Sequence, residues 1–295
     1  MKRPWIYNIF RLTMPVAALA VFASVGVFVM FMSIKGIAAF GPDLFFGDTP
    51  VFAAIFGQQA VWDGLWPALV GSLHLVGLTL CLALFPGVGC GIYLAEYASP
   101  KVNAWAGAAV DMLAGTPSIV MGLFGFTLIL FLRRTFMPEA NTCLLLAAVC
   151  LSLLVLPVLI VSTREAILAV PRDLQLTGIA LGLSKEQCIR HIQLPSAASG
   201  IWSGVVLALG RSAEDTAVIM LTGVVANAGL PAGLGAKFEA LPFAIFYITA
   251  QYQSQSELLR GFGAAFTLLL FAGGLILLAR ALANRYQRRW RENAR

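Results

Sequence analysis

TGIALGLSKEQCIRHIQLP, residues 177–195, is a polar stretch between two long apolar runs. The run before it, residues 143–163, reads CLLLAAVCLSLLVLPVLIVST, and the run after it covers residues 200–222. Runs of about 20 apolar residues have the length of a membrane-spanning helix, because the hydrocarbon core of a bilayer is roughly 30 Å thick. A polar insert between two such runs can be reached by a soluble protein. The stretch therefore predicts a docking segment between two membrane spans.

The composition is that of an integral membrane protein. Of the 295 residues, 59% are hydrophobic and 12% are charged, whereas a soluble domain has about 25% charged residues. The first apolar run is longer than the roughly 7 to 15 residues of a signal-peptide core, so we expect it to be a retained helix.

Six apolar runs predict an all-α polytopic membrane protein with six transmembrane helices. None of them alternates apolar and polar residues with the period of two that is typical of barrel strands. The predicted spans are residues 14–34, 69–94, 108–132, 143–163, 200–222 and 264–283.

Lysine and arginine residues are unevenly divided between the two sides that these spans define. With the N-terminus inside, fourteen of them fall on the inner side and five on the outer side, and Arg211 lies within the fifth span. Basic residues are enriched in cytoplasmic flanks. We therefore expect both termini, and the stretch 177–195, on the cytoplasmic side. The net charge of +6 follows from this pattern, and no nucleic-acid partner is expected.

The cytoplasmic segment is predicted to form two short helices. Asp173 and Thr177 are candidate caps of the first helix. Gly182 then interrupts the chain, Ser184 caps the second helix, and Pro195 starts the next span.

This spacing resembles the coupling motif of binding-protein-dependent ABC importer permeases. That motif reads Glu-Ala-Ala, three residues, Gly, nine residues, Ile, one residue, Leu-Pro. Gly182, Ile192, Leu194 and Pro195 match its second half, whereas Leu176-Thr177-Gly178 stands in place of Glu-Ala-Ala.

Three further segments resemble the A-type permease subunit of phosphate-specific transport systems, and the similarity covers nearly the whole chain. Where that family reads Arg, two residues, Gly-Glu-Thr-Ala-Pro, this chain has an extra acid in place of the glycine and Asp in place of Glu. The segments are Gly91-Ile92-Tyr93-Leu94-Ala95-Glu96-Tyr97, Thr116-Pro117-Ser118-Ile119-Val120-Met121-Gly122-Leu123-Phe124 and Arg211-Ser212-Ala213-Glu214-Asp215-Thr216-Ala217.

The resemblance implies a type I ABC-importer permease fold, with residues 1–295 as a single permease domain and residues 164–195 as its coupling loop. Short helices in this loop are expected to dock into clefts on soluble ATPase subunits. The residues that the resemblance assigns to coupling are Ala180, Leu181, Gly182, Ile192, Leu194 and Pro195.

The resemblance also implies a bacterial inner-membrane complex that imports phosphate. Its other members are expected to be a pair of ATP-binding subunits, a second, C-type permease subunit and an extracytoplasmic phosphate-binding protein. The chain itself has no Walker A motif, so ATP hydrolysis is assigned to a partner.

Neither a metal nor a cofactor is expected. The five cysteines have no metal-ligand spacing, and His74 and His191 lie far apart in the sequence. We interpret the cysteines as packing residues.

The most unusual chemistry is a charged cluster within the fifth span. Arg211, Glu214 and Asp215 each cost about 2.5 to 3.5 kcal/mol at the centre of a bilayer. One interpretation is a structural ion pair, because the three would share one face of a continuous helix. The other is a substrate site, in which Arg211 attracts phosphate and Asp215 or Glu214 accepts its proton; sulfate has no such proton.

The Gly115-Thr116-Pro117-Ser118 sequence interrupts the third span, because Pro117 cannot donate a hydrogen bond to the helix. Broken membrane helices can present backbone N–H groups to anions, which makes Thr116 and Ser118 candidate pathway residues. A simple kink is the alternative.

Three other functions remain open at the level of the sequence. A permease for another oxyanion, such as sulfate or molybdate, would differ only in its site. A sensor or scaffold subunit would keep the docking segment without transport. A membrane enzyme would need a catalytic constellation, and none is apparent in the sequence.

Overall fold

The computed structural model describes residues 4–293, and its regular secondary structure is helical. Within this range the strand-like pairing is limited to an isolated bridge between Val224 and Phe238. Three of the basic residues counted for the inner side, Lys2, Arg3 and Arg295, lie outside the described residues.

Six segments in the described part of the chain are long and apolar enough to cross a membrane, as predicted. The all-α fold with six candidate spans is therefore confirmed. The segments are Thr13–Ala38, Trp66–Glu96, Ser118–Thr135, Leu144–Leu168, Lys185–Glu214 and Gln255–Arg285.

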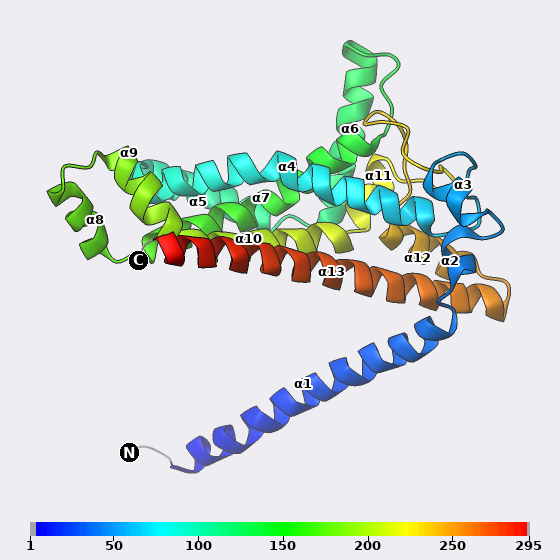
Figure 1. Ribbon diagram of the computed structural model, residues 1–295, viewed down its shortest axis with the longest axis horizontal. Helices are drawn as coiled ribbons and strands as arrows, with labels where there is room; N and C mark the ends of the chain where they lie inside the picture. The colour runs from blue at the N-terminus through cyan, green and yellow to red at the C-terminus, as the bar shows by residue number, and fades with distance from the viewer. Residues whose placement is uncertain (1–3, 294–295) are drawn as a thin grey trace.

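Four long helices lie side by side along the long axis of the molecule (Figure 1). They are α4 (Trp66–Glu96), α7 (Leu144–Leu168), α10 (Leu194–Glu214) and α13 (Gln255–Asn293). The centre of this layer is α7, which packs against both α4 and α10. Its most apolar window is 67% buried, the largest share among the candidate spans.

Glycine allows α4 and α7 to approach closely. A Cβ atom on Gly91 would lie 2.6 Å from the Cβ of Thr163 and 2.8 Å from the carbonyl oxygen of Ile160. Gly89, two residues earlier on α4, has no atom within 4 Å of its Cβ position. Because helix pairs in a membrane are held mainly by van der Waals packing, the small residue at position 91 sets their separation.

We predict that Gly91→Ala destabilises the protein by about 1 to 3 kcal/mol, because the added methyl group overpacks the α4–α7 contact. Gly89→Ala is the matched control and should be neutral or stabilising by up to about 1 kcal/mol, since alanine is the better helix former. Thermal unfolding in detergent would measure both. Equal stability of the two variants would contradict the proposed contact.

The third predicted span, residues 108–132, is wrong as a single helix. The structure divides it into α5 (Pro100–Ala114) and α6 (Ser118–Thr135). Pro117 has extended backbone angles, φ −60° and ψ 138°, and its ring removes the N–H that a continuous helix would need. The interruption predicted at this point is therefore a complete break.

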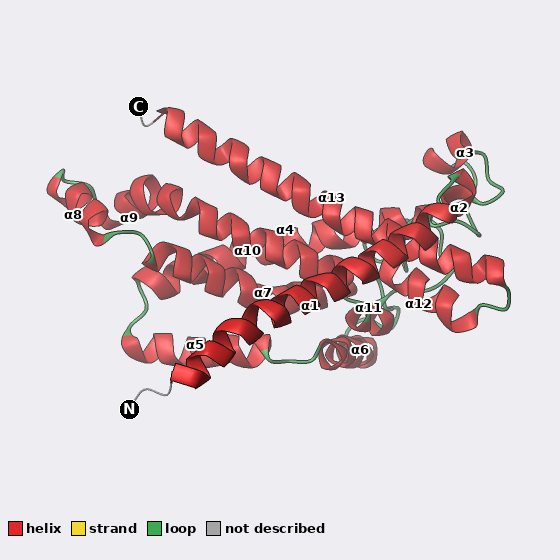
Figure 2. Cartoon of the chain, turned by 90° about the horizontal axis from the view of Figure 1, so that it is seen from below, coloured by secondary structure: helices red, strands yellow, loops and turns green. Residues whose placement is uncertain are grey.

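The fifth predicted span, residues 200–222, is also broken. Helix α10 ends at Glu214, Asp215 has ψ 118°, and the short helix α11 (Ala217–Thr222) follows. The Asp215 carboxylate accepts a hydrogen bond from the backbone N–H of Val218 at 2.9 Å, which satisfies a free donor at the start of α11. Figure 2 shows α6 and α11 nearly end-on, whereas α10 and α13 are seen lengthwise.

The first helix, α1 (Pro4–Ala38), diverges from the other long helices (Figure 1). It meets α13 only toward its C-terminal end, where Phe31 packs on Phe262, and Phe40, just after the helix, packs on Phe266. In the most apolar part of this span, 0% of the residues are buried against the rest of the chain. Most of α1 therefore offers its apolar surface to lipid or to another protein.

The short helices lie at the two ends of the long-helix layer (Figure 1). One end carries α8 (Arg172–Ala180), α9 (Lys185–Cys188) and a five-residue π-helical turn, η1 (Ile189–Gln193). We call it the coupling end, after the segment assigned to coupling in the sequence. The opposite end carries α2 (Pro42–Phe46), α3 (Val51–Ile55) and α12 (Leu241–Gln251).

Candidate functional site

The turn between α8 and α9 has the local structure that its sequence predicts. Gly182 adopts φ 85°, a left-handed conformation that glycine reaches without strain. Ser184 forms a capping box with Gln187: its Oγ accepts from the Gln187 N–H at 3.3 Å, and its own N–H donates to Gln187 Oε1 at 2.8 Å.

The predicted caps of the first helix are wrong. Pro171 occupies the N-cap position of α8 and Asp173 lies in the first turn. Thr177 lies inside the helix, and its hydroxyl donates to the Asp173 carbonyl at 2.8 Å. The helix begins earlier than its polar residues suggest, because Pro171 has no N–H to satisfy and can precede the first turn.

The residues predicted to act in coupling fall into an exposed group and a group that packs inside the segment. Leu181 is 78% exposed and Ile179 is 59% exposed, and Ala180 and Gly182 are also exposed. Ile192, in contrast, packs inside the segment, with its Cδ1 atom 2.5 Å from the position of a Gly178 Cβ. A glycine therefore stands where the motif has its second alanine because Ile192 leaves no room for a side chain.

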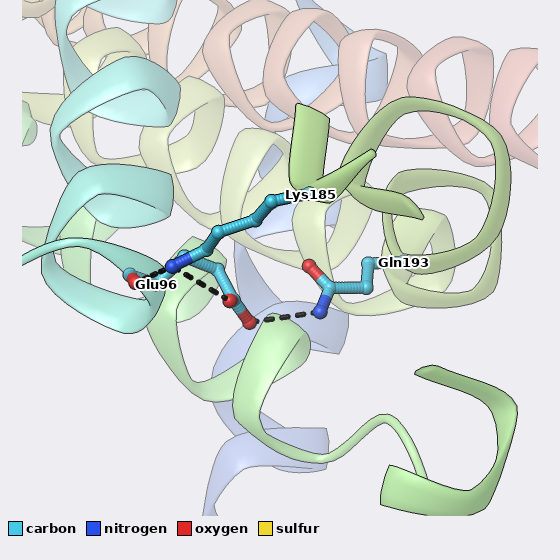
Figure 3. A network of polar contacts seen from close by, with 3 residues as sticks. All are labelled: Glu96, Lys185 and Gln193. Carbon is cyan, nitrogen blue, oxygen red and sulfur yellow. Dashed lines mark hydrogen bonds and ion pairs between the residues drawn. The ribbon is translucent and has the colours of Figure 1, made fainter. Parts of the chain in front are cut away.

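A polar network ties this segment to the end of α4 (Figure 3). Gln193 Nε2 donates to Glu96 Oε1 at 2.8 Å, and Lys185 Nζ lies 3.8 Å from Glu96 Oε2. Lys185 also donates to the Glu96 carbonyl and lies 4.4 Å from the centroid of the Tyr97 ring. Glu96 thus joins α4 to both α9 and η1.

The network has a buried side and an exposed side. Gln193 is only 2% exposed, whereas the side chain of Lys185 is 50% exposed. The Gln193 contact is therefore shielded from water, and η1, which carries it, runs directly into α10 at Leu194 and Pro195. This contact of Glu96 was not predicted from the sequence, although a carboxylate at the end of an apolar span indicates that a polar partner lies nearby.

We predict that Glu96→Ala destabilises the coupling end by about 1 to 3 kcal/mol, because it leaves the buried Gln193 amide without an acceptor. Lys185→Met should cost no more than about 1 kcal/mol, since the ion pair is exposed. Hydrogen exchange over residues 185–193 would compare the two variants. Stronger deprotection in Lys185→Met than in Glu96→Ala would contradict this assignment.

The charged cluster of the fifth span borders a cavity of about 780 Å³ between α10 and α13, with Val158 contributed by α7. Both Arg211 and Glu214 line this cavity. Asp215 does not, because the chain turns away at the break and its carboxylate caps α11. We call this space the α10–α13 cavity.

The interpretation of this cluster as a structural ion pair is not supported by the structure. Among the described side chains, which leave out residues 1–10, 12 and 286–295, the single pair with nitrogen and oxygen within 4.0 Å joins Lys185 to Glu96. Asp215 loses the i, i+4 position relative to Arg211 because α10 ends at Glu214. Arg211 and Glu214 both lie in α10 and form no ion pair there. The guanidinium of Arg211 is therefore exposed without a carboxylate partner in the described part of the chain.

Thr116 and Ser118 lie at the break between α5 and α6 and do not line the α10–α13 cavity. The Thr116 hydroxyl donates to the carbonyl of Met112 at 2.9 Å. Helix α6 packs along α11, since a Cβ on Gly122 would lie 3.0 Å from the Ala217 carbonyl. Gly122 is four residues into α6 and Ala217 begins α11, so the two breaks are within about one helical turn of each other.

The opposite end holds a smaller pocket of about 310 Å³ that mixes aromatic and charged side chains. Its charged residues are Asp63, Glu239, Glu257 and Arg260. Burial raises the pKa of the Glu239 carboxyl, and hydrogen bonds from the backbone N–H groups of Gly229 and Ala228 lower it by less.

Residues 87–292 match a family described as binding-protein-dependent transport system inner membrane component. The chain belongs to this family. The match includes the coupling end, the charged cluster and both helix breaks. The chain is therefore a permease subunit of an ABC importer and a multi-pass inner membrane protein, and permease subunits of this family are non-catalytic.

Individual relatives carry more specific names. The chain is 32% identical over 164 residues to the probable ABC transporter permease protein YqgI of Bacillus subtilis, covering 55% of this chain and 54% of that protein. It is 34% identical over 217 residues to phosphate transport system permease protein PstA 1 of Mycobacterium tuberculosis, covering 73% of this chain and 68% of the relative. Similarity to PstC 1 of the same organism is 28% over 212 residues, covering 64% and 62% of the two chains.

The fold is also found among solved structures. A chain of a bacterial ABC transporter involved in the import of the acidic polysaccharide alginate superimposes with a TM-score of 0.60. The superposition covers 95% of this chain and 98% of that chain at 12% identity. At this identity the likeness establishes the type I importer permease fold and nothing about the substrate.

Proposed function

We propose that this subunit carries inorganic phosphate into the cytoplasm by ATP-driven alternating access. The observation that carries the proposal is Arg211, a guanidinium without a carboxylate partner that lines the α10–α13 cavity on a membrane-spanning helix. A charge in this position is costly unless a counter-ion reaches it. The names of the PstA relatives support phosphate as that ion.

Glu214 is the better candidate for the acceptor of the phosphate proton. It lines the same cavity as Arg211, whereas Asp215 does not line the cavity and its Oδ1 accepts a hydrogen bond from the Val218 N–H. A donor and an acceptor in one cavity suit an oxyanion that still carries a proton, and fully deprotonated sulfate lacks that proton. Thr116 and Ser118 are proposed as pathway residues of the neighbouring α5–α6 break.

The coupling end supplies a route from ATP hydrolysis to this cavity. We assign residues 164–195, within a single permease domain of residues 1–295, to docking on a pair of ATP-binding subunits. The exposed Ile179 and Leu181 are suited to an apolar cleft on such a partner. Because α9, η1 and α10 follow one another without a loop, a displacement of this end would move the helix that carries Arg211.

The other partners are assigned from the remaining surfaces. The uncovered apolar face of α1 supports a second, C-type permease subunit alongside lipid. An extracytoplasmic phosphate-binding protein would dock at the opposite end, which carries α2, α3 and α12. With these assignments we propose that both termini lie in the cytoplasm, as the distribution of basic residues along the sequence predicts.

We predict that Arg211→Ala reduces phosphate uptake to background while the complex still assembles, because the cavity loses its anion-attracting charge. Uptake of labelled phosphate, with sulfate as competitor, would be measured in proteoliposomes that contain the co-purified complex, ATP and binding protein. Arg134→Ala, which removes an exposed arginine from the end of α6, is the control.

The outcomes separate the competing functions. Unchanged uptake by Arg211→Ala would overturn the site. Preference of the unaltered complex for sulfate or molybdate would keep the fold and change the substrate. An assembled complex that transports none of these anions would instead be a sensor or scaffold.

Glu214→Gln should weaken discrimination against sulfate more than it slows phosphate uptake.

A second prediction concerns docking. Leu181→Asp should prevent the ATP-binding subunits from co-purifying with the permease, because it places a charge in an apolar contact, at a cost of roughly 2 kcal/mol or more. Phe52→Asp is the control, since Phe52 is 79% exposed but lies on α3 at the opposite end. Equal recovery of ATP-binding subunits with both variants would show that Leu181 is not in the contact.

A further inference from the structure

A second guanidinium lines the α10–α13 cavity. Arg280 of α13 shares the cavity with Arg211 of α10, and three uncharged polar residues, Ser199, Ser203 and Asn284, line it with them. None of these other four residues belongs to the sequence motifs that resemble known permeases. The cavity thus contains more donors than the Arg211 cluster alone supplies.

The register of the two helices places these residues in order. Helices α10 and α13 run in opposite directions, since α10 begins and α13 finishes at the coupling end (Figure 1). A Cβ on Gly210 would lie 3.8 Å from Ile276 Cδ1, so Ile276 is level with the residue before Arg211. Arg280 lies four residues further along α13, which is about 6 Å nearer the coupling end.

The uncharged polar residues of the cavity lie further toward the coupling end. Ser199 and Ser203 precede Arg211 on one face of α10, and Asn284 follows Arg280 by four residues on α13. The hydroxyl of Ser203 donates to the Ser199 carbonyl at 2.9 Å, which leaves its oxygen free to accept. The Asn284 amide offers two donors. Polar groups therefore extend from Arg211 past Arg280 toward the coupling end.

The charge balance of this cavity is positive. Two arginines and one acid, Glu214, line it. Neither arginine has a carboxylate within 4.0 Å in the described part of the chain. Two guanidinium groups that border one cavity beside a bilayer repel each other unless an anion lies between them. A tetrahedral oxyanion, with several acceptor oxygens, fits this set of donors.

We propose that the α10–α13 cavity binds a phosphate-type oxyanion at a second station, formed by Arg280 with Ser203 and Asn284, between Arg211 and the coupling end. The inference rests on the proposed function for the identity of the ion. An ion leaving Arg211 would meet a second cation about one helical turn away. Arg280 would therefore determine how fast phosphate leaves toward the cytoplasm.

The chain offers a matched control for this proposal. Arg285 lies five residues after Arg280 on α13, is exposed and does not line the cavity. Arg280→Gln should lower the rate of phosphate uptake by about tenfold or more, through loss of a charge-assisted hydrogen bond. Arg280→Lys should restore part of that loss. Arg285→Gln should stay within about twofold of the unaltered complex, as expected for an exposed charge.

Binding can be tested without transport. Leu207→Cys, at an exposed residue that lines the cavity but is not part of the station, would be introduced into the complete complex in nanodiscs, and its reaction with a water-soluble maleimide would be followed with and without inorganic phosphate. The unaltered complex corrects for the native cysteines. Phosphate should slow the reaction, Arg280→Gln should abolish that protection, and Arg285→Gln should preserve it.

These measurements separate failure of the station from failure of the proposed function. Equal uptake by the Arg280→Gln and Arg285→Gln complexes, or protection that survives Arg280→Gln, would overturn the station even if phosphate is transported. Protection that depends on Arg280 in a complex without phosphate uptake would support the station and overturn the import function.

The phosphate group of an anionic lipid could occupy the same cavity in place of a free phosphate ion. The protection experiment would be repeated in nanodiscs of phosphatidylcholine alone and with added phosphatidylglycerol. Protection by inorganic phosphate in phosphatidylcholine alone supports the station for a free ion. Protection that requires phosphatidylglycerol and is independent of inorganic phosphate would assign the cavity to lipid and overturn the proposal.

Discussion

The close contact of α7 with its two neighbours is the constraint on which the other helices depend. Glycines approach α7 from both sides: Gly91 of α4 lies against Thr163, and Gly204 of α10 lies against Ser162, with a Cβ position 2.5 Å from the serine Cβ. Lipid is as apolar as a helix surface, so the hydrophobic effect does not press these helices together within the bilayer, and tight packing must do so. The layer formed by α4, α7 and α10 is the platform that carries the coupling end and the α10–α13 cavity.

The layer of α4, α7 and α10 connects two polar regions that lie far apart along the helices. At the coupling end, Glu96 holds α9 and η1 against α4 through one buried and one exposed contact. At the cavity, Arg211 and Glu214 lie in the last turn of α10, just before the break. The uninterrupted course from α9 into α10 connects them, and the close packing of α10 on α7 restricts how α10 can move.

The parts of this arrangement that follow from local chemistry could be predicted from the sequence. Gly182 and Ser184 act through the residues beside them, so their turn and cap were recognisable, and the apolar runs gave the number of spans. The end of α10 was not recognisable, because Arg211, Glu214 and Asp215 have helical spacing whether or not the helix continues. The contact of Glu96 with Gln193 joins residues 97 positions apart, and no local pattern indicates such a pairing.

The position of α1 has a consequence for how the protein is made. Its principal contact within the described chain is with α13, so α1 finds this neighbour only after α4, α7 and α10 have been synthesised. During synthesis α1 is surrounded by lipid or by the insertion machinery, while α4, α7 and α10 can already pack together. The contact of α1 is thus made later than the packing of α4, α7 and α10, and a truncation within α13 would leave both the α1 contact and one wall of the α10–α13 cavity unformed.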